Sequence, residues 1–176
     1  MDFFEKTLEE KDIYKGKIID VKVQKVKLPN GKESKREIVR HQGGVAVIAY
    51  KNEKEIFMVK QFRKPIDMEI LEIPAGKIEK GEDKKICAER ELEEEIGYKA
   101  KKWTYMGKVV TSPGFCDEYI YLYKAENLYK GEDGLNDEDE FIDIIEVKVD
   151  EIRELIKKGK IIDAKSICAM AMEKIY

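Results

Sequence analysis

The sequence has little histidine and little cysteine, and this scarcity limits the metals that it can bind. His41 is the only histidine, and the three cysteines, Cys87, Cys116 and Cys168, lie far apart without a CxxC spacing. A zinc site of the usual kind is therefore not expected. Cysteines in such an odd, scattered set are typical of reduced thiols in a cytosol. A bound metal would be held by oxygen atoms, which favours Mg²⁺, Mn²⁺ or Ca²⁺.

Long apolar runs and a strong excess of one charge are also absent. No run approaches the roughly 20 apolar residues that span a bilayer, and no apolar segment follows the charged N-terminus, so neither a membrane span nor a signal peptide is expected. The chain carries 34 Lys and Arg against 37 Asp and Glu, a formal net charge of -3, which argues against a polybasic nucleic-acid binder. With 43% hydrophobic residues, the composition predicts a cytoplasmic, globular protein with a buried core.

The first forty residues are typical of a β ribbon. Apolar residues alternate over 17–28, and their phase slips after Val23, as a bulge would produce. A Pro-Asn-Gly-Lys turn at 29–32 is followed by a returning strand over 36–40. We therefore expect an N-terminal β ribbon over 1–42 and a main domain over 43–176.

The rest of the chain alternates between strand and helix patterns. Strands are expected over 45–50, 55–62, 68–73, 103–110, 118–124 and 142–149, and helices over 83–96, 150–158 and 163–174. Gly97 follows the first helix in the position where a glycine ends a helix. Strands mixed with helices in this way indicate an α/β sandwich with a mixed sheet.

The first of these helices carries a dense group of carboxylates. Residues 89–95 read Glu-Arg-Glu-Leu-Glu-Glu-Glu, so five of the seven are acidic. On a helix, Glu91, Glu94 and Glu95 form one patch of like charges at the end that the helix dipole disfavours. A divalent cation would cancel their repulsion. A solvated acidic face paired with nearby Lys and Arg explains the helix alone equally well.

The wider spacing resembles the Nudix hydrolase family. Its signature, the Nudix box, reads G-x5-E-x7-R-E-U-x-E-E-x-G-U, where U is a bulky apolar residue. This chain matches it at Gly76, Glu82, Arg90, Glu91, Leu92, Glu94, Glu95, Gly97 and Tyr98. Tyr98 departs slightly, since aliphatic residues are commoner there. The resemblance implies a Nudix-type α/β/α sandwich (α+β) with a mixed β-sheet and an N-terminal antiparallel β ribbon. It also implies hydrolysis of a nucleoside diphosphate linked to another group, with Mg²⁺ or Mn²⁺ as cofactor.

Each polar position of the box has a physical use. Gly76 lets the backbone turn sharply before the helix, and the carbonyl of Ala75 just before it can reach a metal. The guanidinium of Arg90 can hold neighbouring carboxylates in a fixed fork. The metal ligands that the resemblance implies are Ala75, Glu91, Glu94 and Glu95, with Glu82 as an additional or supporting carboxylate. Arg90 and Glu94 are also expected to act in catalysis.

Residues outside the box resemble the ADP-ribose pyrophosphatase subfamily. Pro113 in Ser-Pro-Gly follows Tyr98 by 15 residues, and the segments 61–63 (Gln-Phe-Arg), 73–76 (Ile-Pro-Ala-Gly) and 36–40 are similar to those of that subfamily. The resemblance covers about residues 16–170. It implies Mg²⁺-dependent hydrolysis of ADP-ribose to AMP and ribose 5-phosphate. Two alternatives stay open: a Nudix hydrolase of another nucleoside diphosphate sugar such as GDP-mannose, and a Nudix-fold nucleotide sensor without catalysis.

A second acidic cluster spans residues 132–140, with six acids in nine residues. A solvated loop between two strands explains it simply. In the resembling subfamily, however, a Glu-x-Glu in this loop supplies the general base, which makes Glu138 the candidate base and Glu140 a further metal ligand. The neighbouring residues Asp137 and Asp139 leave the register open by about one position.

Substrate contacts are expected from arginines and from the turn near Pro113. Arg63 and either Arg36 or Arg40 can bind the phosphates and the terminal ribose, because a guanidinium binds phosphate through two hydrogen bonds. Exposed ion pairs explain these arginines nearly as well. Glu118 is expected to accept a hydrogen bond from a ribose in the subfamily manner.

The family resemblance further implies a homodimer. Its N-terminal ribbons would exchange or pack across the two-fold axis and complete each adenosine site. Phe3, Phe4 and Tyr14 are candidates to stack on adenine from the partner chain, although such residues more often anchor their own segment. His41 is expected to have no catalytic role.

Overall fold

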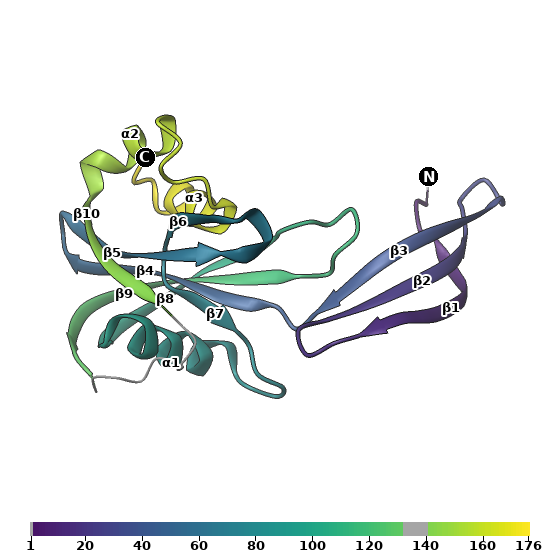
Figure 1. Cartoon of the computed structure of the whole chain (residues 1–176), viewed down its shortest axis with the longest axis horizontal. Coiled ribbons are helices and arrows are strands. Elements are labelled where there is room, and N and C mark those ends of the chain that lie inside the picture. The colour runs from purple at the N-terminus through teal and green to yellow at the C-terminus, as the bar shows by residue number, and fades with distance from the viewer. Residues whose placement is uncertain (1, 132–140) are drawn as a thin grey trace. The chain divides into compact units, whose positions relative to one another are not determined.

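The computed structural model describes residues 2–131 and 141–176 (Figure 1). The chain divides into two compact units. The first comprises the residues up to Gly43 together with Val110–Tyr119, and the second comprises Gly44–Val109 and Ile120–Tyr176.

The first unit contains an antiparallel sheet of three strands in the order β1-β2-β3. The strands are β1 (Lys6–Lys15), β2 (Ile19–Lys27) and β3 (Glu33–His41). β1 is not predicted from the sequence, because every residue of this strand is exposed and the strand therefore shows no alternation between buried and exposed positions. Hydrogen bonds from Val39 to Phe115 and from Asp117 to Val39 join β3 to the 110–119 segment.

The bulge expected in β2 is wrong. β2 and β3 pair without interruption from Ile19↔His41 to Lys27↔Glu33. The register shifts lie in β1 instead, between Thr7 and Glu9 and between Asp12 and Tyr14. The extra residues belong to β1, and they change the direction of side chains in β1 only. The change of phase in the β2 sequence therefore does not correspond to a bulge in β2.

The second unit is built on a mixed seven-stranded sheet with the central order β10-β5-β4-β9-β8, while β6 pairs with β5 and β7 pairs with β4. Its strands are β4 (Gly44–Asn52), β5 (Glu55–Arg63), β6 (Met68–Glu72), β7 (Ala75–Lys77), β8 (Tyr98–Val110), β9 (Tyr119–Lys130) and β10 (Ile142–Lys148). β4 pairs in parallel with β9 and antiparallel with β5. The predicted strands are present, and β7 is an additional short strand.

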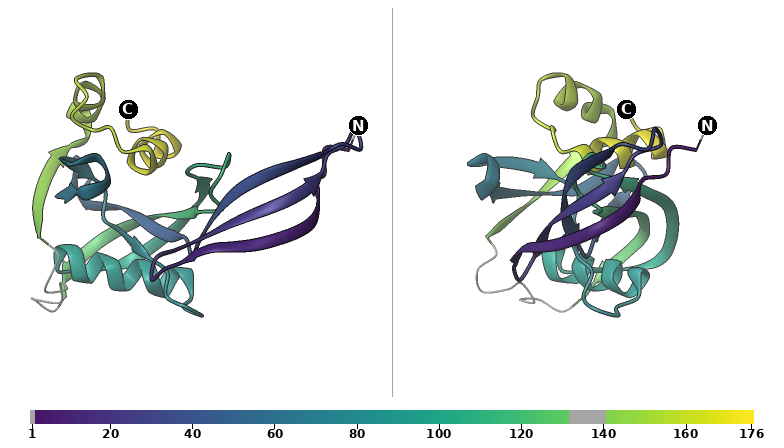
Figure 2. Two further views of the ribbon diagram at one scale, coloured as in Figure 1. Left: turned by 45° about the vertical axis from the view of Figure 1, so that its right-hand side comes forward. Right: turned by 90° about the vertical axis from the view of Figure 1, so that its right-hand side faces the viewer.

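Helices cover both faces of this sheet. α1 (Lys84–Ile96) lies on one face, and α2 (Ile152–Lys157) and α3 (Ala164–Glu173) lie on the other (Figures 1 and 2). Two short 3-10 turns span Lys64–Ile66 and Val149–Glu151. Alternate residues of β4 enter the two apolar cores: Val45 and Val47 pack with α1, whereas Ala46 and Ile48 pack with α2 and α3. Burial on both sides explains why β4 reads as a continuous apolar run.

The ends of α1 follow the sequence signals. The Asp83 side chain accepts hydrogen bonds from the N–H groups of Lys85 and Ile86, so it caps the helix N-terminus. Gly97 has φ of 69° and donates its N–H to the carbonyl of Glu93 at 2.8 Å. The predicted glycine stop is therefore confirmed, and it requires a residue that tolerates the left-handed conformation.

The three cysteines are free thiols. Within the described part of the chain, no helix is both long enough and apolar enough to cross a membrane.

The half-buried phenol of Tyr50 predicts a loss of stability at alkaline pH. Burial raises its pKa to about 12. The Glu173 carboxylate adds to this effect, and it accepts a hydrogen bond from the Tyr50 hydroxyl at 3.4 Å. A folded-state pKa above the ordinary value of 10.0 favours folding at pH values below 10.0, and this contribution is lost as the pH rises through about 12.

Urea unfolding of the wild type and of Tyr50→Phe at several pH values checks this expectation. Lysines also titrate in this range, so the quantity of interest is the difference between the two proteins. We expect the wild type to lose more free energy of unfolding than Tyr50→Phe between about pH 10 and pH 12. Parallel profiles would contradict the assignment.

Candidate active site

The box carboxylates lie where α1 faces the short strand β7. Ala75 opens β7 and pairs with Ala46 of the central strand β4. The N–H of Ala75 donates to Oε2 of Glu95 at 2.9 Å, and Glu95 is buried at 4% exposure. A strand backbone and a helix carboxylate are thus joined directly, and the segment that carries the Ala75 carbonyl lies beside the acidic face of the helix.

Gly76 is needed for space, and the role predicted for it, a sharp turn, is wrong. A Cβ at this position would lie 1.8 Å from the carboxyl carbon of Glu91 and 2.0 Å from each of its oxygens. Gly76 lies inside β7, and the glycine with left-handed backbone before the helix is Gly81, with φ of 84°. The missing side chain of Gly76 therefore creates the cradle in which the Glu91 carboxylate lies.

Arg90 binds three carboxylates of the box. It donates through Nε and Nη2 to the two oxygens of Glu82 at 2.9 and 3.1 Å, and through Nη1 to Glu94 at 2.7 Å. Its Nη1 also lies 2.9 Å from Oε1 of Glu91. The hydrogen bonds from Arg90 lower the pKa of Glu82 to about 2, and those to Glu82 raise the pKa of Arg90. Glu82 and Arg90 are therefore both ionised throughout the physiological pH range.

The donor set suits a hard divalent cation. Carboxylate oxygens come from one helix face, at Glu91, Glu94 and Glu95. The cradle at Gly76 holds the Glu91 carboxylate beside β7. Within residues 2–131 and 141–176, no three His, Cys, Asp or Glu side chains are already arranged as a metal site. Arg90 engages Glu91 and Glu94 instead, so metal binding would require these carboxylates to turn from the guanidinium. The candidate base Glu138 and the candidate ligand Glu140 lie outside the described residues.

Arg63 contacts a buried carboxylate of the same unit. Its Nε and Nη2 donate to the two oxygens of Glu72 at 2.7 and 2.9 Å, and Lys165 binds the same carboxylate. Glu72 is 1% exposed. Glu72 is not among the residues predicted from the sequence, although an acid within the apolar run Ile-Leu-Glu-Ile at 70–73 is a signal of a buried, paired carboxylate.

The other substrate candidates lie in the first unit. Arg36 pairs with Glu5 through two hydrogen bonds of 2.9 and 2.6 Å. Arg40 donates through Nη1 to Asp117 at 2.9 Å. Pro113 lies in a turn in which the Phe115 N–H donates to the carbonyl of Ser112.

Asp117 holds this segment to β3, and its neighbour Glu118 lies beside His41. Oε2 of Glu118 accepts the hydroxyl of Thr111 at 2.7 Å, and its Oε1 lies 3.2 Å from Nδ1 of His41. Asp117 was missed, although its Oδ1 accepts the backbone N–H of His41 at 2.8 Å. Burial alone would raise the pKa of Asp117, but the hydrogen bonds from the His41 N–H and from Arg40 outweigh it and lower the pKa.

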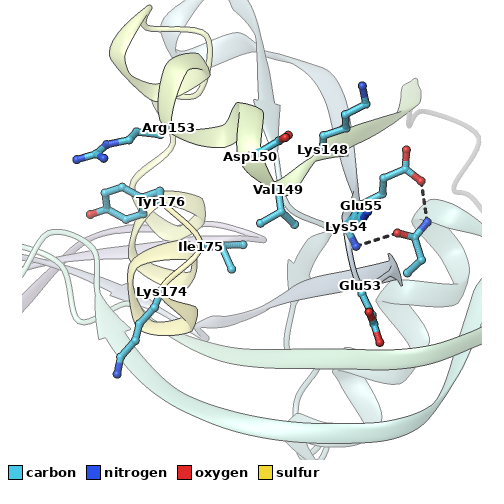
Figure 3. Close-up of a pocket in the computed structure, with 11 residues that line it drawn as sticks. Glu53, Lys54, Glu55, Lys148, Val149, Asp150, Arg153, Lys174, Ile175 and Tyr176 are labelled. Carbon is cyan, nitrogen blue, oxygen red and sulfur yellow. Dashed lines mark hydrogen bonds between the residues drawn. The ribbon is translucent and has the colours of Figure 1, made fainter.

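A cleft of about 860 Å³ on the α2 and α3 side of the sheet contains none of the predicted residues. It is lined by the β4–β5 turn, the segment before α2 and the C-terminal residues (Figure 3). Lys148, Arg153 and Lys174 point in different directions (Figure 3). Their charges therefore do not converge on one point of the cleft.

Family models match nearly the whole chain. The model of the NUDIX domain matches residues 40–170, and that of the nucleoside diphosphate sugar hydrolase N-terminal domain matches residues 5–39. The chain therefore belongs to the Nudix family, and the resemblance seen in the sequence is confirmed.

Its similarity to individual proteins is also extensive. The chain is 51% identical to the methanol dehydrogenase activator of Bacillus methanolicus, covering 96% of this chain and 91% of that protein. It is 50% identical to the ADP-ribose pyrophosphatase of Bacillus subtilis, covering 94% and 90%. A GDP-mannose pyrophosphatase of Cronobacter sakazakii is 32% identical, over 76% and 74%.

A solved structure described as an ADP compounds hydrolase has a similar fold. It superposes with a TM-score of 0.84 at 18% identity, covering 97% of this chain and 92% of that chain. The predicted fold class, a Nudix-type sandwich with a mixed sheet and an N-terminal antiparallel ribbon, is confirmed.

Proposed function

We propose that this Nudix protein hydrolyses the pyrophosphate bond of ADP-ribose to AMP and ribose 5-phosphate, with Mg²⁺ or Mn²⁺ as cofactor. The observation that carries the proposal is the 50% identity to an ADP-ribose pyrophosphatase over 94% of the chain. The box carboxylates gathered around Arg90 support it, because they supply the oxygen donors that such a reaction needs.

The metal would be held by the carbonyl of Ala75 and by box and loop carboxylates. We propose Glu91, Glu94, Glu95 and Glu140 as ligands, with Glu82 as a supporting carboxylate. When bound, the cation neutralises the charge of the pyrophosphate. Arg90 keeps Glu82 ionised, and it holds Glu94 and Glu91 until they turn from the guanidinium to a cation.

Proton transfer is assigned to Glu138. Its carboxylate would accept a proton from the water that attacks one phosphorus. The new bond forms between the water oxygen and that phosphorus, and the bond from the phosphorus to the bridging oxygen breaks. The products are AMP and ribose 5-phosphate.

Among the arginines, Arg40 has the fewest hydrogen bonds to give up in order to bind phosphate. In the described structure it donates to Asp117 through Nη1, whereas Arg36 and Arg63 each donate through two or more nitrogens. Arg36 and Arg63 would have to release or share their carboxylates to bind the substrate. Pro113 and Glu118 would shape the turn that contacts a ribose.

We also propose that the protein is a cytoplasmic homodimer that associates through its first unit. Support comes from large apolar side chains that the first unit leaves exposed: Phe3, Phe4, Leu8, Ile13 and Tyr14. Phe3 and Phe4 are 77% and 72% exposed. Sedimentation equilibrium should give twice the monomer mass of 20.5 kDa, and a monomer at micromolar concentration would refute the dimer.

A substrate panel with Mg²⁺ and with Mn²⁺ tests the activity. We expect release of AMP from ADP-ribose, with kcat/KM at least about tenfold above that for GDP-mannose, a difference of about 1.4 kcal/mol. A preference for GDP-mannose would favour the alternative hydrolase. Tight nucleotide binding without turnover of any nucleoside diphosphate derivative would favour the sensor.

Glu138→Gln and Glu140→Gln, compared side by side, test the two loop assignments. Loss of a general base should lower kcat by about 10²–10⁴-fold, so Glu138→Gln should have this effect at saturating metal. Glu140→Gln should mainly raise the metal concentration needed for half-maximal rate. The opposite outcome would exchange the two roles.

A second candidate function follows from the 51% identity to a methanol dehydrogenase activator. We expect this protein to stimulate a purified methanol dehydrogenase from that relative's organism. Comparing the wild type with a Glu94→Gln variant shows whether stimulation needs the box. An unchanged dehydrogenase rate would remove this candidate.

A further inference from the structure

The segment just before the box is held at each residue by the surrounding fold. The Glu72 carboxylate is bound by Arg63 and Lys165. The carbonyl of Pro74 accepts the N–H of Val47 at 2.8 Å. Together with the hydrogen bond from Ala75 to the box helix, these contacts fix the path of residues 72–75. The carbonyl proposed as a metal ligand belongs to the last of these residues.

The remaining residue, Ile73, is held by α3. Its N–H donates to Oγ of Ser166 at 2.9 Å, and both Ile73 and Ser166 have zero exposure. Ser166 is a polar side chain in a helix that otherwise packs Ala169 and Met170 into an apolar core. Alanine would suit both the helix and the core better. The contribution of the Ser166 hydroxyl is therefore its hydrogen bonds and not its packing.

The first turn of α3 orients this hydroxyl. Ser166 donates its Oγ–H and its N–H to Oδ2 of Asp163 at 2.5 and 2.9 Å. Since the hydroxyl proton points to Asp163, a lone pair of Oγ is left to accept the Ile73 N–H. Lys165, whose Nζ lies 3.0 Å from Oδ2 of Asp163, connects the same turn to Glu72. The first turn of α3 thus binds two consecutive residues of the segment, Glu72 through Lys165 and Ile73 through Ser166.

We infer that Ser166, oriented by Asp163, is a positioning residue that places the Ala75 carbonyl for the divalent cation. This inference rests on the proposed function, because that function makes Ala75 a ligand. Metal–oxygen distances must be correct within about 0.2 Å, so the path of the backbone two residues away matters. Without the hydroxyl, the buried Ile73 N–H would have no acceptor, and the segment would shift to find one.

A purely structural role would join α3 to the sheet and leave metal affinity unchanged. The two roles differ in what they predict for the folded protein. A structural contact lowers the midpoint of thermal unfolding alone. A positioning contact also weakens cation binding under conditions in which every molecule is folded.

The test measures Mn²⁺ binding to the full chain by calorimetry or electron paramagnetic resonance, without substrate, together with thermal unfolding. We expect Ser166→Ala to weaken Mn²⁺ binding about tenfold or more, the effect typical of groups that orient metal ligands. Asp163→Ala should weaken it to a similar extent. Asp163→Asn keeps an acceptor oxygen for Ser166 and should restore much of the affinity.

The control is Ile152→Ala, which removes a fully buried side chain from the same core that has no polar atom to hydrogen-bond residues 72–75. It should lower the unfolding midpoint and leave Mn²⁺ affinity unchanged. Affinity within twofold of wild type in folded Ser166→Ala or Asp163→Ala, or an equal loss in Ile152→Ala, would overturn the inference alone. A wild type that binds no Mn²⁺ would overturn the proposed metal site and this inference together.

Discussion

Replacing Glu94 with glutamine is expected to lower kcat/KM for ADP-ribose by at least about 100-fold with the fold intact. Substitutions of groups that merely orient metal ligands cost about 10–100-fold, so the loss of a charged ligand should cost more. The effect on folding should be small. Glu94 is partly exposed and contacts Arg90 one helical turn away at 2.7 Å, and such pairs stabilise proteins by less than about 1 kcal/mol.

Glu89→Gln is the matched control for this experiment. Glu89 belongs to the same acidic run of α1, but its carboxylate pairs with Lys85 at 3.2 Å. It is outside the nine positions of the box. The same chemical change should therefore leave turnover within about twofold of wild type. If Glu94→Gln were as active as Glu89→Gln, the metal assignment of the box would be wrong.

The second large effect is expected for Gly76→Ala, which should abolish most activity while the protein still folds. The new Cβ would overlap the end of the Glu91 side chain, 1.8 Å from its carboxyl carbon. The new Cβ displaces only the flexible end of a side chain, so the free energy of unfolding should fall by about 1 kcal/mol, the low end for overpacking. The carboxylate would then leave its cradle, and kcat/KM should fall by about 100-fold.

Gly44→Ala provides the opposite case and serves as the control. Its Cβ would lie 2.8 Å from the main-chain carbonyl oxygen of Gly76. Backbone inside a paired sheet cannot move aside as a side chain can, so this variant should lose about 1–3 kcal/mol of stability. Urea unfolding and steady-state kinetics on both variants separate the two effects. A Gly76→Ala variant with wild-type kinetics would show that the Glu91 carboxylate is not needed where it lies.

The box and its helix could be predicted because their signals are local. The Asp83 side chain accepts hydrogen bonds from N–H groups at the start of α1, and Gly97 ends the helix. Each acts on residues within about one turn of itself. The spacing of Glu91, Glu94 and Glu95 places them on one face of any helix. The strand β4 could be predicted for a similar reason, since burial on both faces leaves a continuous apolar run.

The misses share a different cause. β1 has exposed residues throughout and pairs with β2, a strand that follows it, so its own pattern carries no signal of burial. The partner of Arg63 is Glu72 at the end of β6, and the second cation on that carboxylate, Lys165 of α3, is distant in sequence from Glu72. Asp117 is recognisable only once the 110–119 segment is paired with β3.

The sequence by itself determined the family, the α+β architecture and the carboxylates available for a metal. These follow from short-range periodicity and from a motif whose residues are close along the chain. Only the tertiary structure decided what each polar group contacts. The Glu91 carboxylate lies beside Gly76, Arg90 binds three carboxylates, and the Ser166 hydroxyl accepts the Ile73 N–H. Hydrogen bonds and van der Waals contacts act over a few ångströms, so they depend on which distant segments the fold brings together.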